Sequence, residues 1–291
     1  MKGSGMKGSD MAQASPLHEE HVLLGASFSV DGTGVERPVD YAAASADSAR
    51  LKDGALLADM GGMTSLLVSG HGCGDFVGAA MAGRRLAIGE TAFEAALVGD
   101  GTVASIPLMA RTGTEEFALW DLTPRGETLF AWLSFVIGIG REGVRPYEGV
   151  AVEDVSERLV PLCLCGAAAQ RVLSDYLRDE ERLPEEGRVA DVRLDGRIAT
   201  LVASLRLSGE TYCYLVMVPP TLARAVWRSL LSFGEVSPAP PSLMTTAIAG
   251  RLPWLAPAST LDRLELDAAF LARHGLVREG RDYIGARGLL D

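Results

Sequence analysis

The stretch from Leu51 to Ala110 constrains the fold of this chain more than any other. An apolar segment ends in the Ser69-Gly70 turn and is followed by apolar residues at helical spacing. Two further apolar runs flank Asp100-Gly101, a dipeptide that favours the tight turn of a β-hairpin. The strands expected from this pattern are Ser65–Val68, Ala92–Val98 and Val103–Met109. The sequence therefore predicts a strand, a helix and a hairpin, in that order.

The pattern starts again about 95 positions later. An apolar run at 159–164 leads through Gly166 into a helical pattern at 167–177. Asp195-Gly196 then separates two apolar runs and predicts a second hairpin. Two strand–glycine–helix units, each followed by a hairpin, predict a mixed α+β fold with mostly antiparallel strands.

Charge and hydrophobicity exclude several classes of protein. The chain has 27 Lys and Arg against 38 Asp and Glu, so its formal net charge is −11. A molecule with this charge repels nucleic acids and anionic membranes, and neither is expected as a partner. No run of 18 apolar residues predicts a transmembrane helix, and four cysteines without an export signal favour the cytoplasm.

The motifs and their order resemble those of the folate-binding aminomethyltransferase family, whose type member is the T-protein of the glycine cleavage system. A Pro-Val-Asp-Tyr segment ending at Tyr41 is similar to one that lies along the family's central cavity, and residues 281–287 resemble a late Lys-Asp-Phe-Ile-Gly-Lys turn. Other matching positions are Leu57, Asp59, Met63, Val68, Ser69, Gly70, Asp100 and Gly101. The resemblance implies an α+β fold with two related strand–helix halves around a central cavity.

The resemblance also implies a tetrahydrofolate site. The catalytic carboxylate of the family falls on Ser105, and a serine hydroxyl needs a partner before it can act as a base. Tyr214 takes the position of a glutamate that binds the pterin ring. The cofactor-binding residues implied by the matches are Tyr41, Met63, Glu210, Tyr214, Arg251 and Arg287. No metal site is expected.

Three other features lead to separate expectations. His21 belongs to a polar segment and is expected on the solvated surface. Cys163 and Cys165 lie in an apolar run and are expected to be small buried residues rather than a metal pair. Either Glu94 or Asp100 could replace the lost carboxylate, although Asp100 in a hairpin turn favours a role in the turn itself.

The chain is expected to consist of one core with two flanking parts. Residues 1–16 are expected to be a disordered tail because the segment is rich in glycine and serine. Residues 17–235 form the folate-binding-like core, and 236–291 form a C-terminal segment that completes it. The C-terminal β-barrel of full family members is not expected, and a partner subunit could take its place.

The function implied by the resemblance is tetrahydrofolate-binding one-carbon transfer, of a methyl or an aminomethyl group. Its partners would be a small-molecule one-carbon donor or a carrier protein. The alternative is a non-catalytic accessory or assembly protein that keeps the fold. A third option is a domain whose cavity is filled by its own side chains. The sequence leaves the one-carbon donor and the oligomeric state open.

Overall fold

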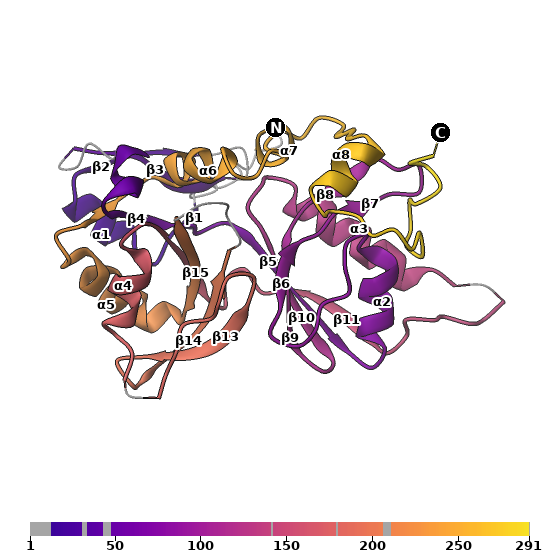
Figure 1. Cartoon of the computed structure of the whole chain (residues 1–291), viewed down its shortest axis with the longest axis horizontal. Coiled ribbons are helices and arrows are strands. Elements are labelled where there is room, and N and C mark those ends of the chain that lie inside the picture. The colour runs from indigo at the N-terminus through magenta and orange to yellow at the C-terminus, as the bar shows by residue number, and fades with distance from the viewer. Residues whose placement is uncertain are drawn as a thin grey trace, which may run out of the picture.

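The computed structural model describes residues 13–30, 34–42, 48–140, 142–178, 180–205 and 211–290. Two large sheets dominate the fold (Figure 1). The six-stranded sheet has the order β13-β14-β15-β12-β4-β16, with β13 (Val189–Leu194), β14 (Ile198–Ser204), β15 (Tyr212–Val218), β12 (Val160–Gly166), β4 (Ala55–Asp59) and β16 (Val236–Pro238). The five-stranded sheet has the order β11-β5-β10-β9-β6, with β11 (Val150–Asp154), β5 (Thr64–Gly70), β10 (Glu116–Asp121), β9 (Leu108–Gly113) and β6 (Thr91–Phe93).

Smaller elements surround the two sheets. A three-stranded sheet contains β1 (Gln13–Ala14), β3 (Val35–Tyr41) and β2 (Ala26–Val30), and a hairpin pairs β7 (Ala96–Leu97) with β8 (Val103–Ser105). The helices are α1 (His18–Leu23), η1 (Ser48–Lys52), α2 (Cys73–Ala80), α3 (Gly126–Gly138), α4 (Ala169–Ser174), α5 (Pro220–Leu231), α6 (Pro241–Ala249), α7 (Leu255–Ala258) and α8 (Ala268–Arg273). Most strand pairs are antiparallel, as predicted, and the parallel ones described are β1–β3 and β4–β16.

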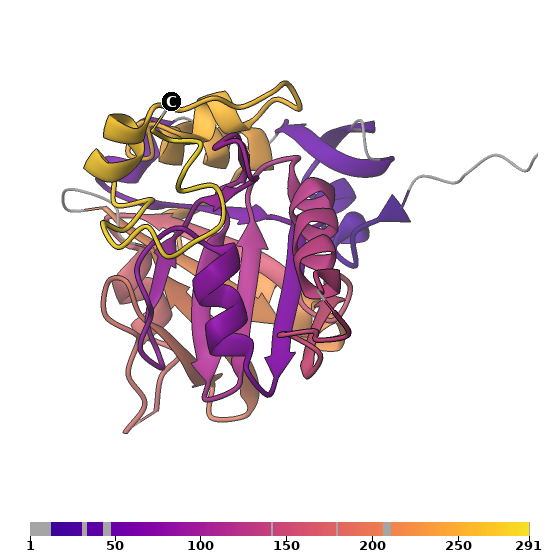
Figure 2. The same ribbon diagram turned by 90° about the vertical axis from the view of Figure 1, so that its right-hand side faces the viewer.

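The two large sheets face each other across one apolar core, and helices cover their outer faces. Alternate residues of β15 and β10 point into the core between the sheets, together with residues of the C-terminal segment. On the outer side of the six-stranded sheet, α4 and α5 close a second core. On the outer side of the five-stranded sheet, α2 and α3 close a third, as Figure 2 shows. The result is a helix–sheet–sheet–helix arrangement.

The two strand–glycine–helix units predicted from the sequence occupy corresponding places in the two halves. Gly70 ends β5 with φ 103°, and Gly166 ends β12 with φ 143°. A Cβ at either position would collide with a backbone carbonyl, of Gly149 in one case and Gly54 in the other. Only glycine fits these turns, because the backbone conformation and the close approach both exclude a side chain.

Both predicted hairpins are confirmed, with one difference in detail. β7 pairs with β8 across Asp100-Gly101, and β13 pairs with β14 across Asp195-Gly196. The strands expected at 92–98 and 103–109 are each interrupted, which gives β6 and β7, then β8 and β9. Pro107 explains the second break, since it has no N–H to offer a sheet, and its carbonyl instead accepts from Glu94 N at 3.1 Å.

The chain ends contribute differently to the fold. The sequence predicts a disordered tail at residues 1–16, of which residues 1–12 lie outside the described residues. The next two residues form β1, which pairs in parallel with β3. The C-terminal segment runs along the top of both halves in Figure 1 and supplies buried residues, among them Met244, Trp254, Leu271 and Leu276, to the core between the sheets. Within the described part of the chain, no helix has the length and hydropathy needed to cross a membrane.

Candidate functional site

Ser105, which stands where the sequence analysis places a missing carboxylate, is fully buried at the end of β8. Its hydroxyl donates a hydrogen bond to Asp121 Oδ2 at the end of β10. The other oxygen of Asp121 accepts from the backbone N–H and the hydroxyl of Thr123, at 2.9 and 2.6 Å. Three donors therefore hold Asp121, and Ser105 has the carboxylate partner that a serine needs for chemistry.

Arg125 connects this pair to two other segments. Its Nε donates to the carbonyl of Ala104 at 3.0 Å, and its Nη1 donates to the carbonyls of Thr260 and Asp262 at 2.6 and 2.9 Å. Its charge also faces Asp121. The Ser105–Asp121–Arg125 cluster thus joins β8, the turn after β10 and the C-terminal segment.

Asp121 is the buried carboxyl group of this cluster, and its surroundings shift its pKa. Burial raises the pKa of the Asp121 carboxyl, and hydrogen bonds from Ser105 and Thr123 offset part of the rise. Ser105 is 0% exposed and Asp121 is 1% exposed, so neither can touch a ligand in this conformation. Their hydrogen bonds hold segments of the chain together, and chemistry at Ser105 would require those segments to separate.

A second buried polar cluster lies on the outer face of the six-stranded sheet. His21 Nδ1 is 3.0 Å from the Tyr41 hydroxyl, and His21 Nε2 is 3.0 Å from Asp59 Oδ2, which also accepts from the Ser15 hydroxyl. With a proton on Nε2, the imidazole donates to Asp59 and accepts from the Tyr41 hydroxyl at Nδ1. The ring lies edge-on to Trp227, with centroids 5.1 Å apart. Burial, and then the charge of Asp59, raise the pKa of the Tyr41 hydroxyl, which therefore remains a donor.

The expectation that His21 lies on the solvated surface is wrong. Helix α1 carries it inward, to 1% exposure, together with Glu20, whose two carboxyl oxygens bind Arg228 of α5 at 2.6 and 2.8 Å. The sequence does contain a signal for this arrangement, because Leu17, Glu20, His21 and Leu24 follow one another at helical spacing. The polar residues at 18–21 suggest a solvated surface, although two of them lie on the buried face of the helix.

The residues assigned to a folate site lie on different faces of the sheets. Met63 packs in the core between the sheets, and Tyr41 lies on the outer side with His21. Tyr214 also points outward, into the core closed by α4 and α5, because side chains alternate along β15 and its neighbours Cys213 and Leu215 point inward. Burial raises the pKa of Tyr214 to about 12. The sheet therefore separates Tyr41 and Tyr214 from Met63.

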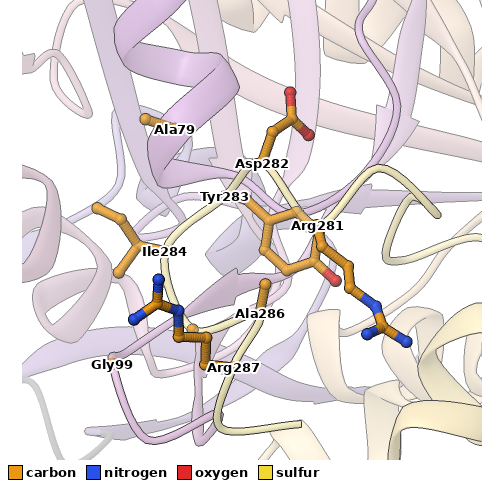
Figure 3. Close-up of a pocket in the computed structure, with 9 residues that line it drawn as sticks. Ala79, Gly99, Arg281, Asp282, Tyr283, Ile284, Ala286 and Arg287 are labelled. Atoms are coloured by element: carbon orange, nitrogen blue, oxygen red, sulfur yellow. The ribbon is translucent and has the colours of Figure 1, made fainter. Parts of the chain in front are cut away.

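The remaining assigned residues are also dispersed. Arg251 is exposed just after α6. Arg287 is exposed and lines an open hollow beside the β7–β8 hairpin (Figure 3). Glu210 lies outside the described residues. Of the predicted cofactor-binding residues that the structure describes, Met63 shares the inner core with Ile106, the residue next to Ser105. Tyr41 and Tyr214 lie on the outer side of a sheet, whereas Arg251 and Arg287 are exposed.

The described residues between the two sheets do not fit a tetrahydrofolate. A pterin ring requires polar groups that pair with its ring nitrogens, with a carboxylate as the strongest acceptor. Here apolar side chains fill the space, and Met63, Ile106 and Trp254 are 5%, 2% and 6% exposed. The hydroxyl of Ser105 donates its hydrogen to Asp121 and is fully buried, so it does not face a space that a ring could enter.

Glu94 and Asp100 have opposite environments. Asp100 is exposed in the hairpin turn, where its carboxylate accepts from Thr102 N at 3.0 Å, so it supports the turn. Glu94 is fully buried between β6 and β7, and among the described residues neither of its oxygens has a hydrogen-bond partner. Burial raises the pKa of Glu94 well above its ordinary value, and the charges of Arg84 and Arg278 offset only part of the rise.

The cysteines are buried, as predicted. Cys163 and Cys165 are 2% and 1% exposed, and Cys163 Sγ lies 3.6 Å from Cys213 Sγ. Hydrogen bonding with these two thiols, and then burial, raise the pKa of Cys213 well above its ordinary value, which disfavours a reactive thiolate. Among the residues that the structure describes, no three His, Cys, Asp or Glu side chains are grouped to hold a metal ion.

Comparisons with known proteins agree on one family. The family model described as the GCVT N-terminal domain matches residues 17–245. An aminomethyltransferase of Chlorobium limicola is 25% identical over 222 residues, which cover 75% of this chain and 59% of the relative. The chain thus spans less than two thirds of that relative's length.

The solved structures support the same fold. The glycine cleavage system aminomethyltransferase T from Bartonella henselae superposes with a TM-score of 0.73 at 20% identity, over 96% of this chain and 74% of that one. At this level of identity the similarity concerns the fold alone. It confirms the predicted α+β fold class.

Proposed function

Because the chain belongs to the family of the GCVT N-terminal domain, we propose that it is a non-catalytic member, which keeps the fold as a binding or assembly module for another protein. The observation that carries this proposal is the closed centre of the molecule. Ser105, which the sequence resemblance places at the position of the family's carboxylate, donates its hydroxyl hydrogen to Asp121. Met63 and Trp254 belong to the side chains that fill the space between the sheets.

A catalytic centre needs polar groups that converge on a space open to a substrate. The inner faces of both sheets contribute apolar side chains, such as Leu56 and Leu215 on one side and Leu108 on the other. These residues stabilise the fold, but they offer nothing that could orient a one-carbon donor. The chain also spans only part of its aminomethyltransferase relative.

One observation favours a second candidate function, tetrahydrofolate-dependent transfer of a methyl or aminomethyl group. Asp121 provides a buried carboxylate in hydrogen-bond contact with Ser105, the position from which a carboxylate has been lost. If the surrounding segments opened, this pair could present a carboxylate at nearly the same place. The two functions therefore differ in whether the centre of the molecule opens to a folate.

A thermal-unfolding titration with tetrahydrofolate and 5-methyltetrahydrofolate separates them. We expect no saturable shift of the melting temperature when either ligand is titrated to about 1 mM. A ligand present at 100 times its Kd would stabilise the chain by about 2.7 kcal/mol, which such a titration detects easily. A known folate-binding enzyme serves as the control for ligand quality. Saturable stabilisation, abolished by Asp121→Asn, would overturn the non-catalytic proposal in favour of the second candidate.

An assembly role also requires that the chain bind a second protein. The chain alone has a mass of 30.8 kDa. Produced at its natural level in its own cells and isolated under mild conditions, it should elute with a second protein in constant stoichiometry and at a correspondingly larger mass. Elution at 30.8 kDa under every mild condition would count against an assembly role.

A further inference from the structure

An open hollow of about 390 Å³ lies where the end of the chain meets α2 and the β7–β8 hairpin (Figure 3). Ala79 of α2, Gly99 of the hairpin turn and residues 281–287 line it. Its volume falls within the range of about 300–1,000 Å³ that is usual for small-molecule sites. It is separate from the Ser105–Asp121–Arg125 cluster and does not depend on the proposed function.

The hollow carries an excess of positive charge. Among the described residues that line it, Asp282 is the one acidic side chain, and its two oxygens already bind Arg278 Nε at 2.6 Å and Arg85 Nη2 at 3.0 Å. These contacts hold the pKa of Asp282 at about 2. Arg281 and Arg287 are both exposed, and neither has an ion-pair partner in the described part of the chain. Two guanidinium groups therefore remain available in a chain whose net charge is −11.

The two arginines are held apart by a fixed surface. Figure 3 shows their side chains extending on opposite sides of Tyr283. Arg278 lies over the Tyr283 ring, 4.9 Å from its centroid, and this cation–π contact fixes the ring. The floor of the hollow is thus a partly buried aromatic ring with one guanidinium to either side.

The backbone of the segment is also constrained. Ile284 N donates to the carbonyl of Ala79 at 2.9 Å, and Gly285 has φ 88° in close contact with the hairpin, where a Cβ would lie 2.5 Å from Val98 O. Arg281 has φ 49°, a left-handed conformation that few non-glycine residues adopt. Such strain, kept by a surrounding structure that fixes it, is concentrated at ligand-binding sites.

We propose that this hollow binds a small polyanion, whose phosphate or carboxylate groups pair with Arg281 and Arg287. The planar fork of a guanidinium binds two oxygens of either anion at once, which makes arginine the usual residue for both. The backbone contacts of Ile284 and Gly285 fix the segment from which both arginines extend, so a molecule with two anionic groups can pair with both at once, whereas a simple monoanion cannot.

Calorimetric titration of the full chain with pyrophosphate, and separately with citrate, tests this site. We expect one-to-one binding of at least one of them, weakened tenfold or more by Arg281→Ala and by Arg287→Ala. The matched control is Arg193→Ala, which removes an exposed arginine from β13. Tighter binding of pyrophosphate would identify a phosphate ligand, and tighter binding of citrate a carboxylate ligand. No saturable binding of either, or equal weakening by Arg193→Ala, would overturn the proposal.

Arg281→Gly distinguishes binding from a merely structural role. Glycine accepts the left-handed conformation without strain, so this variant should melt at a higher temperature than the parent chain. It should nevertheless lose polyanion binding as fully as Arg281→Ala does. Full binding by the stabilised glycine variant would show that the arginine side chain is not part of a site.

Discussion

Asp121 and Glu94 are both buried carboxyl groups on the five-stranded side of the molecule, yet their surroundings are opposite. Asp121 accepts three hydrogen bonds, from Ser105 and Thr123, and faces the charge of Arg125. Glu94 is equally enclosed, but neither oxygen has a hydrogen-bond partner in the part of the chain that the structure describes, and its carboxyl fills the space that a side chain at Gly83 would need. Burial raises the pKa of both groups; hydrogen bonds from Ser105 and Thr123 offset part of the rise at Asp121, and mainly the charges of Arg84 and Arg278 do so at Glu94.

The difference shows that burial alone does not reveal what a carboxyl group does. A fully bonded carboxylate holds segments together, because each of its partners would be left unpaired without it. An unbonded one favours its neutral form and makes stability depend on pH. The raised pKa of each group makes stability fall as pH rises, but removing Asp121 would also leave the donors of Ser105 and Thr123 unpaired.

The largest expected effect is that of Asp121→Ala. The change leaves the Ser105 and Thr123 donors unpaired and removes the counter-charge of Arg125, so we expect a loss of about 3–5 kcal/mol in the free energy of unfolding. Urea denaturation at pH 7 measures it. Asp191→Ala, on an exposed position of β13, is the control and should change stability by less than about 0.5 kcal/mol. A loss at Asp121 no larger than that of the control would mean that the cluster does not hold the segments together.

Glu94→Gln should have a smaller effect of opposite sign. The pKa of Glu94 is raised in the folded chain, so the native state retains its proton where the unfolded state, with a pKa of about 4.3, has lost it. Stability contributed by the protonated group is therefore complete below about pH 4.3 and is lost as pH rises through the folded-state pKa. The loss amounts to about 1.4 kcal/mol for each unit by which the two pKa values differ.

Urea denaturation between pH 4.5 and 8 would test this prediction. Glutamine does not titrate, so the variant should be more stable than the parent chain at pH 8, and the difference should shrink toward pH 4.5. Glu186→Gln, in an exposed loop, is the matched control and should leave the pH dependence unchanged. A parallel pH dependence in the parent chain and Glu94→Gln would show that Glu94 ionises without cost, and the contrast with Asp121 would fail.

Tyr41→Phe extends the comparison to the other sheet, with the smallest expected effect. It removes the hydroxyl that donates to His21 Nδ1, and leaves a buried acceptor unpaired at a cost of about 1–2 kcal/mol. Thermal and urea unfolding at pH 7 measure the loss. Tyr212→Phe, at an exposed tyrosine of β15, should be nearly neutral. If Tyr41→Phe were equally neutral, the hydrogen bonds of the His21 cluster would not contribute to stability.

Local features of the sequence determined most of the fold. Gly70 and Gly166 mark the strand-to-helix turns because only glycine fits there. Asp100-Gly101 and Asp195-Gly196 mark the hairpins, where Gly101, Asp195 and Gly196 adopt left-handed backbone and Asp100 accepts a hydrogen bond from Thr102 N. Each of these signals depends on one or two neighbouring residues. The α+β fold class, the two related halves and the family followed from their order along the chain.

The contacts of the buried polar groups were decided only by the tertiary structure. Asp59 follows His21 by 38 positions and Ser105 precedes Asp121 by 16, and no local pattern indicates that these side chains meet. The face on which Tyr214 lies depends on strand alternation, since a shift of one residue would move its side chain to the other side of the sheet. Sequence spacing predicts the elements because their conformations are set locally. The partners of a buried side chain depend on which distant segments pack against it, and that is settled only when the whole core forms.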